Sequence, residues 1–154
     1  MDLLTTELLE TIGSLLRNKG RQVWTAHPGM SVYEALALMS AREVGALPVV
    51  SGNALVGLVS ERDYARKVIL RGRSSRDTPV SEIMTSPVIS AAPEATVDEC
   101  MRAMTAHRVR HLPIVEDGRL TGIISIGDLV NWIITSQEKT IRHLHDYIVG
   151  AYPG

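Results

Sequence analysis

Two short motifs place a hydroxyl group and a carboxylate at the spacing that starts a helix. Ser60 is followed three residues later by Asp63, and Ser125 in the same way by Asp128. A carboxylate accepts hydrogen bonds from both hydroxyls of a vicinal diol such as that of ribose. In the first turn of a helix, a carboxylate is also held in place and is attracted by the partial positive charge at the helix N-terminus. The alternative is a plain capping box, in which each Asp bonds only backbone amides.

Basic residues near these motifs are candidates for binding phosphate, because the guanidinium fork of arginine matches phosphate oxygens. Arg62 and Arg66 follow the first serine, and Arg110 and His111 precede the second motif. The first copy has Gly45 at the position that matches Arg110. We therefore expect two unequal sites, and the alternative is a solvated basic surface.

Catalytic and metal-binding patterns are not found in the sequence. His143 and His145 are two residues apart and diverge on a helix. Cys100 follows the apolar residue Val97 by one helical turn and is expected to be a buried, inert thiol. The sequence contains no zinc-binding motif, nucleophile elbow or P-loop. We predict no catalytic residue and no metal site.

The chain contains one repeat with an offset of 65 positions. Matching residues include Leu47-Pro48 and Leu112-Pro113, and no gap is needed from Val23 to Ile69. A fixed offset with intact spacing indicates one supersecondary unit used twice. We place the first repeat at residues 8–76, the second at 77–138, and a C-terminal helical extension and tail at 139–154.

Each repeat is expected to form a β-α-β-β-α unit. A short strand is predicted at 23–25, helices starting at the caps Ser31 and Thr96, and hairpins over 47–59 and 112–124. Each hairpin leads into the Ser-Asp motif and a second helix. An N-terminal helix is expected to end at Gly20, and Ile141, Leu144 and Ile148 indicate a further amphipathic segment near the C-terminus.

Composition limits the possible partners. The chain has 154 residues, a net charge of −1 and a single cysteine. There is no overall attraction to nucleic acid or to an anionic membrane, and no apolar run approaches membrane-spanning length. The acidic N-terminus lacks the apolar core of a signal peptide. We expect a cytoplasmic protein with no membrane partner and no nucleic-acid partner.

The paired Leu-Pro-Val/Ile segments, the paired Gly-x-x-Ser-x-x-Asp segments and the β-α-β-β-α order resemble a CBS-domain pair, the regulatory module named after cystathionine β-synthase. The resemblance covers roughly residues 8–138, and the whole chain is similar to small stand-alone CBS-pair proteins of bacteria and plant organelles. It implies an α+β fold of two βαββα units about a pseudo-two-fold axis and a dimeric disc. It also implies two clefts between the repeats that bind adenosyl ligands such as AMP, ADP, ATP, NAD(H) or S-adenosylmethionine.

With such a ligand, Asp63 and Asp128 are predicted to bind ribose, with Ser60 and Ser125 beside them. Arg62, Arg66, Arg110 and His111 are the phosphate candidates. Adenine needs an apolar slot with backbone hydrogen-bonding groups. Its candidates are Thr25, Ala26, His27, Ala46, Pro48, Val49, Ser90, Ala91, Ala92, Pro113 and Ile114; the alternative is that some of them are only core residues and strand ends.

The leading functional hypothesis is a sensor of adenine nucleotides, AMP, ADP, ATP or NAD(H), that needs no metal, forms a homodimer and signals to an effector protein. One alternative is an enzyme that processes nucleotides. The other is a nucleic-acid-binding protein that uses the basic stretch 62–76. That stretch has only Tyr64 as an interleaved aromatic residue, which weakens the nucleic-acid reading.

Overall fold

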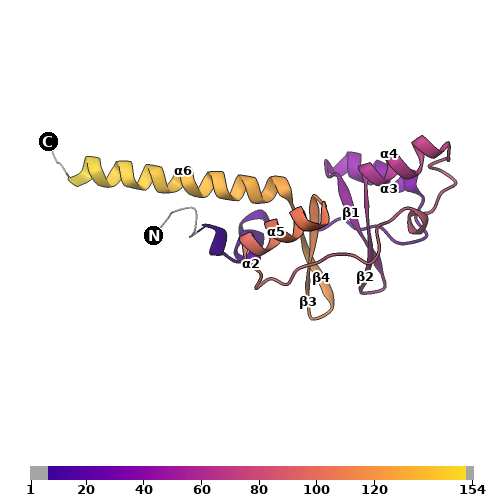
Figure 1. The fold of residues 1–154 in the computed structure, drawn as a ribbon, viewed down its shortest axis with the longest axis horizontal. Coiled ribbons are helices and arrows are strands. Elements are labelled where there is room, and N and C mark those ends of the chain that lie inside the picture. Colours follow the sequence, from indigo (N-terminus) through magenta and orange to yellow (C-terminus); the bar gives the residue numbers. More distant parts are fainter. Residues whose placement is uncertain (1–6, 152–154) are drawn as a thin grey trace. The chain divides into compact units, whose positions relative to one another are not determined.

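A computed structural model describes residues 7–151 (Figure 1). Residues 1–6, on which the expectation of no signal peptide rests, lie outside the described residues, as do 152–154. The elements in order are α2 Ile12–Lys19, α3 Val32–Arg42, β1 Ala46–Ser51, β2 Ala54–Ser60, α4 Glu61–Lys67, the 3-10 turns η1 Ile69–Arg71 and η2 Val80–Glu82, α5 Val97–His107, β3 His111–Glu116, β4 Arg119–Ser125 and α6 Ile126–Ala151. The order helix, hairpin, helix occurs twice, which confirms the mixed α+β repeat.

The chain forms two compact units, each assembled from separate stretches of sequence. The first unit comprises the residues up to Gly20, Ala92–Leu112 and the chain from Ile124 onward. The second unit comprises Arg21–Ala91 and Pro113–Ile123. We describe each unit by itself.

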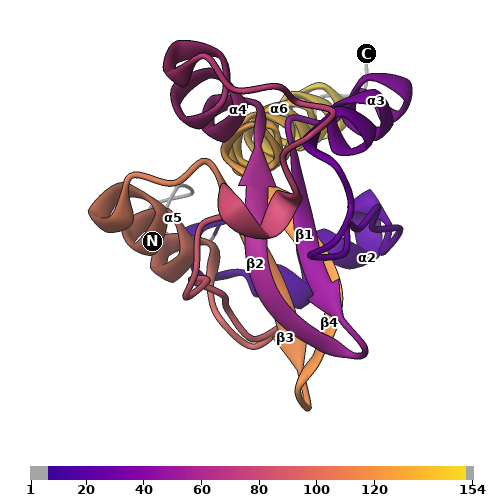
Figure 2. The ribbon, with the colours of Figure 1, turned by 90° about the vertical axis from the view of Figure 1, so that its right-hand side faces the viewer.

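The hairpin of β1 and β2 is the centre of the second unit. Its antiparallel register pairs Ala46 with Ser60 and Val49 with Gly57. Figure 2 shows α3 and α4 at the same end of this hairpin, opposite its turn. The core of the unit consists of Ala26, Val32, Ala35, Met39, Leu47, Val49, Val59, Val68, Val80 and Ile83.

Helices α2, α5 and α6 make up most of the first unit. Their fully buried side chains include Ile12 and Leu16 of α2, Met104 of α5 and Leu129 of α6. Helix α2 ends as predicted at Gly20, whose φ of 99° is disfavoured for residues with a side chain. Helix α6 is continuous to Ala151, so the predicted C-terminal extension continues the helix that follows the second Ser-Asp motif.

Helices α3 and α5 begin and end in the same way, as expected for two copies of one unit. Ser31 and Thr96 each accept a hydrogen bond, at 3.1 Å, from the amide three residues later. Both helices end in a left-handed residue, Glu43 at φ 55° and Arg108 at φ 54°. The local hydrogen bonds of the two copies therefore repeat at the same offset of 65 as the sequence.

The segment that leads into each repeat bonds to the other repeat. In the first unit, the Val97 amide at the start of α5 donates to the Glu10 carbonyl at 2.9 Å. In the second unit, the Val32 amide donates to the Thr78 carbonyl at 2.8 Å. Each lead-in thus satisfies backbone groups at the start of a helix that belongs to the other copy.

The first strand of each predicted unit is reduced to one bridging residue. Instead of a strand at 23–25, Ala26 alone pairs with Val49, and Ala91 alone pairs with Ile114. The next bond of such a parallel ladder, toward the N-terminus, would need an amide hydrogen at Pro48, which proline lacks. The matching residue of the second copy is Pro113, and the same limit holds there.

Candidate functional site

The first Ser-Asp motif forms a complete capping box at the start of α4. Asp63 Oδ2 accepts hydrogen bonds from the Ser60 amide and the Ser60 hydroxyl, both at 3.0 Å. The Asp63 amide donates to Ser60 Oγ at 3.2 Å. Asp63 Oδ1 lies 3.0 Å from Lys67 Nζ, an ion pair within one turn of α4. Asp63 therefore caps α4 through Oδ2, which fixes the orientation of its carboxylate, and its Oδ1 atom is paired with Lys67.

The second motif has the same cap and a different cation. Asp128 Oδ2 accepts from the Ser125 amide at 2.8 Å, and the Asp128 amide donates to Ser125 Oγ at 3.0 Å. Lys19, at the end of α2, donates to the same carboxylate oxygen at 2.6 Å. Partial burial raises the pKa of Asp128, but the hydrogen bonds from Lys19 and the Ser125 amide outweigh it and leave the pKa below its ordinary value.

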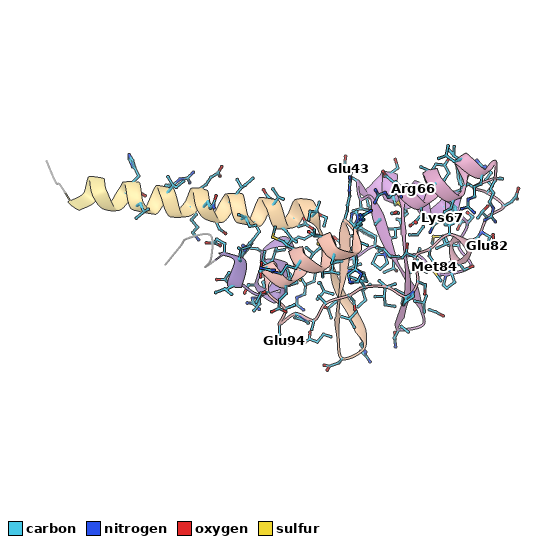
Figure 3. All side chains as sticks on the ribbon, viewed as in Figure 1. Glu43, Arg66, Lys67, Glu82, Met84 and Glu94 are labelled. Atoms are coloured by element: carbon cyan, nitrogen blue, oxygen red, sulfur yellow. The ribbon has the colours of Figure 1, made fainter. Side chains whose placement is uncertain are left out.

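The sequence analysis predicted neither lysine as the partner of its acid. Lys67 lies four residues after Asp63, a spacing that favours ion pairs on a helix and was available as a signal. It also donates to the carbonyl of Ile83 at 2.9 Å, in the region that Figure 3 marks with Lys67, Glu82 and Met84. Lys19 is 109 positions from Asp128, so only the tertiary structure brings them together.

Part of the predicted adenine set gathers along the start of β1. The Ala26 amide donates to the Pro48 carbonyl at 2.9 Å. Ala26, Pro48 and Val49 are buried, whereas Thr25 and His27 on either side of Ala26 are exposed. The buried residues form a wall, and the exposed neighbours are the ones that a ligand could reach.

The hairpin register joins this apolar set to the acid of the same copy. Ala46, the first residue of β1, pairs with Ser60, the last residue of β2. The Glu61 amide donates to the Gly45 carbonyl at 3.1 Å, which ties the start of α4 to the start of β1. The apolar candidate Ala46 and the capped Asp63 therefore lie at the same end of the β1–β2 hairpin.

The second copy repeats the backbone arrangement of the apolar set. The Ala91 amide donates to the Pro113 carbonyl at 3.1 Å. Pro113 and Ile114 are buried, Ala91 is half-buried, and Ser90 and Ala92 are exposed. The roles of these residues in adenine binding stay a prediction.

The phosphate candidates differ in exposure. Arg62 and Arg66 are exposed on α4 (Figure 3 labels Arg66), Arg110 is exposed, and His111 is half-buried at the start of β3. The Ile126 amide donates to the Arg110 carbonyl at 2.9 Å, which puts the backbone of Arg110 at the beginning of α6. This bond repeats the contact between Glu61 and Gly45 in the first copy, so Arg110 occupies the place that the sequence offset assigns to it.

The side chains that the structure describes include no group of three or more His, Cys, Asp or Glu residues placed to hold a metal ion. Cys100 is buried, and burial, with a smaller contribution from Glu99, raises its pKa to about 11. In the same described range, no helix has the length and apolarity needed to cross a membrane.

Comparison with known proteins identifies relatives of the whole arrangement. The CBS domain family matches residues 18–70 and 80–135. The chain is 38% identical over 152 residues to the CBS domain-containing protein CBSX3, mitochondrial, of Arabidopsis thaliana, covering 92% of this chain and 73% of that protein. A putative signal-transduction protein with CBS domains from Burkholderia ambifaria has a similar structure, with TM-score 0.80 and 47% identity over 83% of this chain and 96% of that one. The CBS domain pair of protein MJ0100, solved with 5′-methylthioadenosine and S-adenosyl-L-methionine, has TM-score 0.72 and 26% identity over 80% of this chain and 94% of that one.

Proposed function

The chain belongs to the CBS-domain family, and from this premise we propose that it is a regulatory module that binds an adenine nucleotide and passes occupancy to a partner protein. AMP, ADP, ATP and NAD(H) are the ligands to test. The bound methylthioadenosine and S-adenosylmethionine of the MJ0100 domain pair support an adenosyl ligand as the chemical class.

One observation carries the proposal: the same fixed carboxylate occurs in both copies, each at the end of a hairpin. A cap holds Asp63 and Asp128 in one orientation, so a diol would meet a preorganised acceptor. In the first copy the hairpin register brings the apolar set to the same end as the acid. We infer that in the first copy ribose binds Asp63 and the base lies against the buried wall of Ala26 and Pro48.

The basic stretch 62–76 is less suited to nucleic acid than its composition indicates. Arg73 forms an ion pair with Glu82, and the guanidinium of Arg76 lies 4.0 Å from the ring centroid of Tyr33. Lys67 is paired with Asp63. These three cations already have partners within the second unit, and stacking on Arg76 occupies one face of Tyr33.

Isothermal titration of the full-length protein with each nucleotide tests the ribose role. Asp63→Ala and Asp128→Ala should each weaken binding at one site about ten- to a hundredfold, because a hydroxyl would lose its acceptor. Asp98→Ala is the matched control, since Asp98 also lies in a first helical turn but pairs with Arg102 on an exposed face. If the acids act only as caps, Asp63→Ala and Asp128→Ala lower the melting temperature of the ligand-free protein and leave affinity unchanged.

A second titration separates phosphate from nucleoside recognition. Arg110→Ala should weaken ATP and ADP binding more than adenosine binding, because adenosine has no phosphate to lose. Equal losses for adenosine and ATP would place Arg110 outside the phosphate site. Full retention of affinity in the Asp63→Ala/Asp128→Ala double variant would contradict the nucleotide-sensor proposal itself.

Four further features accompany this proposal: the assembly, the recipient of the signal, the repeat boundaries and the compartment. We propose a homodimer as the functional assembly and an effector protein as the recipient of the signal. We keep the repeats at 8–76 and 77–138 with an extension at 139–154, supported by hydrogen bonds that recur at an offset of 65. The cytoplasm is the compartment that the sequence predicts, although the Arabidopsis relative is mitochondrial by name.

A further inference from the structure

Helix α6 exposes a line of large aliphatic side chains to solvent. The exposed fractions are 45% for Val130, 49% for Ile134, 63% for Ile141 and 51% for Leu144. Helix α6 has 26 residues, about 39 Å at the usual rise. In Figure 1 its yellow C-terminal part continues past α2 and α5, the other helices of the same unit. An apolar stripe on such a helix costs solubility unless something covers it.

The stripe is separate from the face that α6 uses inside its own unit. Leu129 is fully buried and Ile133 is half-buried, whereas their neighbours Val130 and Ile134 are exposed. At about 100° per residue, Leu129 and Ile133 project from one side of the helix and Val130 and Ile134 from the next. The stripe therefore contributes little to the core of the first unit.

The spacing along the stripe is that of a coiled coil. Its positions alternate in steps of four and three residues: Val130, Ile134, Gln137, Ile141, Leu144 and, in the sequence, Ile148. Isoleucine recurs every seventh residue at one set of positions, and the other set holds Val130, Gln137 and Leu144. β-Branched residues at position a with leucine at position d favour two parallel strands, and the pair of Ile141 and Leu144 follows this rule.

From this pattern we propose that α6 pairs with α6 of a second copy of this chain, in parallel and in register, as a short two-stranded coiled coil. The pairing deepens the proposed homodimer by assigning its interface, and it does not depend on nucleotide binding.

The polar residue in the seam fits an identical partner. Gln137 lies at a d position between Ile134 and Ile141. Its side-chain amide both donates and accepts, so two glutamines that meet across a two-fold axis satisfy one another. A single polar residue in an apolar seam also fixes register, as asparagine does at position a.

The flanking residues allow the same arrangement. In a parallel pair, position g of one helix lies beside position e of the other. The g positions include Ile133 and Thr140, and the e positions include Glu138 and His145. None of these contacts joins two like charges, so electrostatic repulsion does not oppose parallel self-pairing.

Disulfide cross-linking of the full-length protein tests the pairing. Leu144→Cys places a thiol in the seam, where the two-fold axis brings it beside its own copy, and mild oxidation should give a covalent dimer in high yield. Lys139→Cys is the matched control, because position 139 is exposed on the opposite side of the same helix and should give little dimer. The native Cys100 is buried and does not compete.

Ile134→Glu/Ile141→Glu in the Leu144→Cys background should abolish the cross-link and raise the dissociation constant of self-association by about a hundredfold or more, since it buries charges in the seam. Circular dichroism and a cooperative melt check that the protein stays folded. No cross-link at Leu144→Cys, equal cross-linking at Lys139→Cys, or a cross-link that survives the glutamates would each overturn the pairing. A dimer mass in light scattering together with no cross-link would retain the homodimer and point to another interface. A monomer mass would reject both the homodimer and the α6 pairing, and would indicate that the stripe binds a helix of a different protein.

Discussion

Gly57 of β2 is predicted to be intolerant of even one added methyl group. A Cβ built on Gly57 would lie 2.8 Å from Met84 Cγ and 3.1 Å from Met84 Cβ, and it would overlap the sulfur atom. Met84 is held there because the segment after the linker pairs with β2: the Thr85 amide donates to the Leu58 carbonyl at 2.8 Å, and the Leu58 amide donates back at 3.1 Å. The glycine of this motif thus has a packing role in the second unit.

The size of the effect follows from which atoms are too close. Moving only the sulfur would need a rotamer change, but the contacts with Met84 Cγ and Cβ also require the backbone near Thr85 to shift. Overpacking of this kind costs about 1–3 kcal/mol of unfolding free energy. For a chain of this length, 1 kcal/mol corresponds to about 2–4 °C in melting temperature. Gly57→Ala should therefore lower the melting temperature by about 2–12 °C.

A double-mutant cycle measured by chemical denaturation isolates this contact. Met84→Ala removes the overlapping atoms, so Gly57→Ala should cost less than about 0.5 kcal/mol in that background. Gly29→Ala is the control, because a methyl group there meets only His27 ring atoms at 3.6 Å and 3.7 Å, an ordinary contact. If Gly57→Ala costs the same with and without Met84, the packing explanation is refuted.

Two further predictions concern titratable groups. Because the pKa of Asp128 is lowered in the folded protein, its contribution to stability is fully present above the ordinary aspartate pKa and is lost as pH falls through the lowered value. Below about pH 4, the unfolding free energy should therefore fall less steeply with decreasing pH in Asp128→Asn than in the unaltered protein, and Lys19→Gln should also reduce this slope. An unchanged slope in both variants would contradict the ion pair. Because Cys100 is buried and its pKa is raised to about 11, a thiol reagent at mildly alkaline pH should react with the native protein only as fast as it unfolds. Rapid reaction of the folded protein would show that the thiol is accessible.

Features set by neighbouring residues were predictable from the sequence alone. The caps at Ser31 and Thr96, the end of α2 at Gly20 and the hairpins all depend on residues within one turn or one strand pair. Local hydrogen bonding and hydrophobic period act over that range. The Ser-Asp caps were read correctly for the same reason, while the ligand roles of the acids stay predictions.

The first strand and the length of α6 were harder to read. Reduction of that strand to Ala26 depends on Pro48, a residue more than twenty positions away that lacks the required amide hydrogen. The continuity of α6 was harder to read because its buried residues, such as Leu129, and its exposed apolar residues, such as Ile141 and Leu144, lie on different faces of the helix.

The partners of the repeated acids illustrate the division between sequence and tertiary structure. The sequence determined that Asp63 and Asp128 would be fixed by serine caps, because each cap spans three residues. The spacing of four residues already favours Lys67 as the partner of Asp63. Only the tertiary structure decided that Asp128 meets Lys19 from α2, whose segment packs against the second copy. Two nearly identical motifs therefore have unequal surroundings. Lys19 reaches Asp128 because α2 buries the face that carries Ile12 and Leu16, and no local pattern says which distant segment that face will pack against.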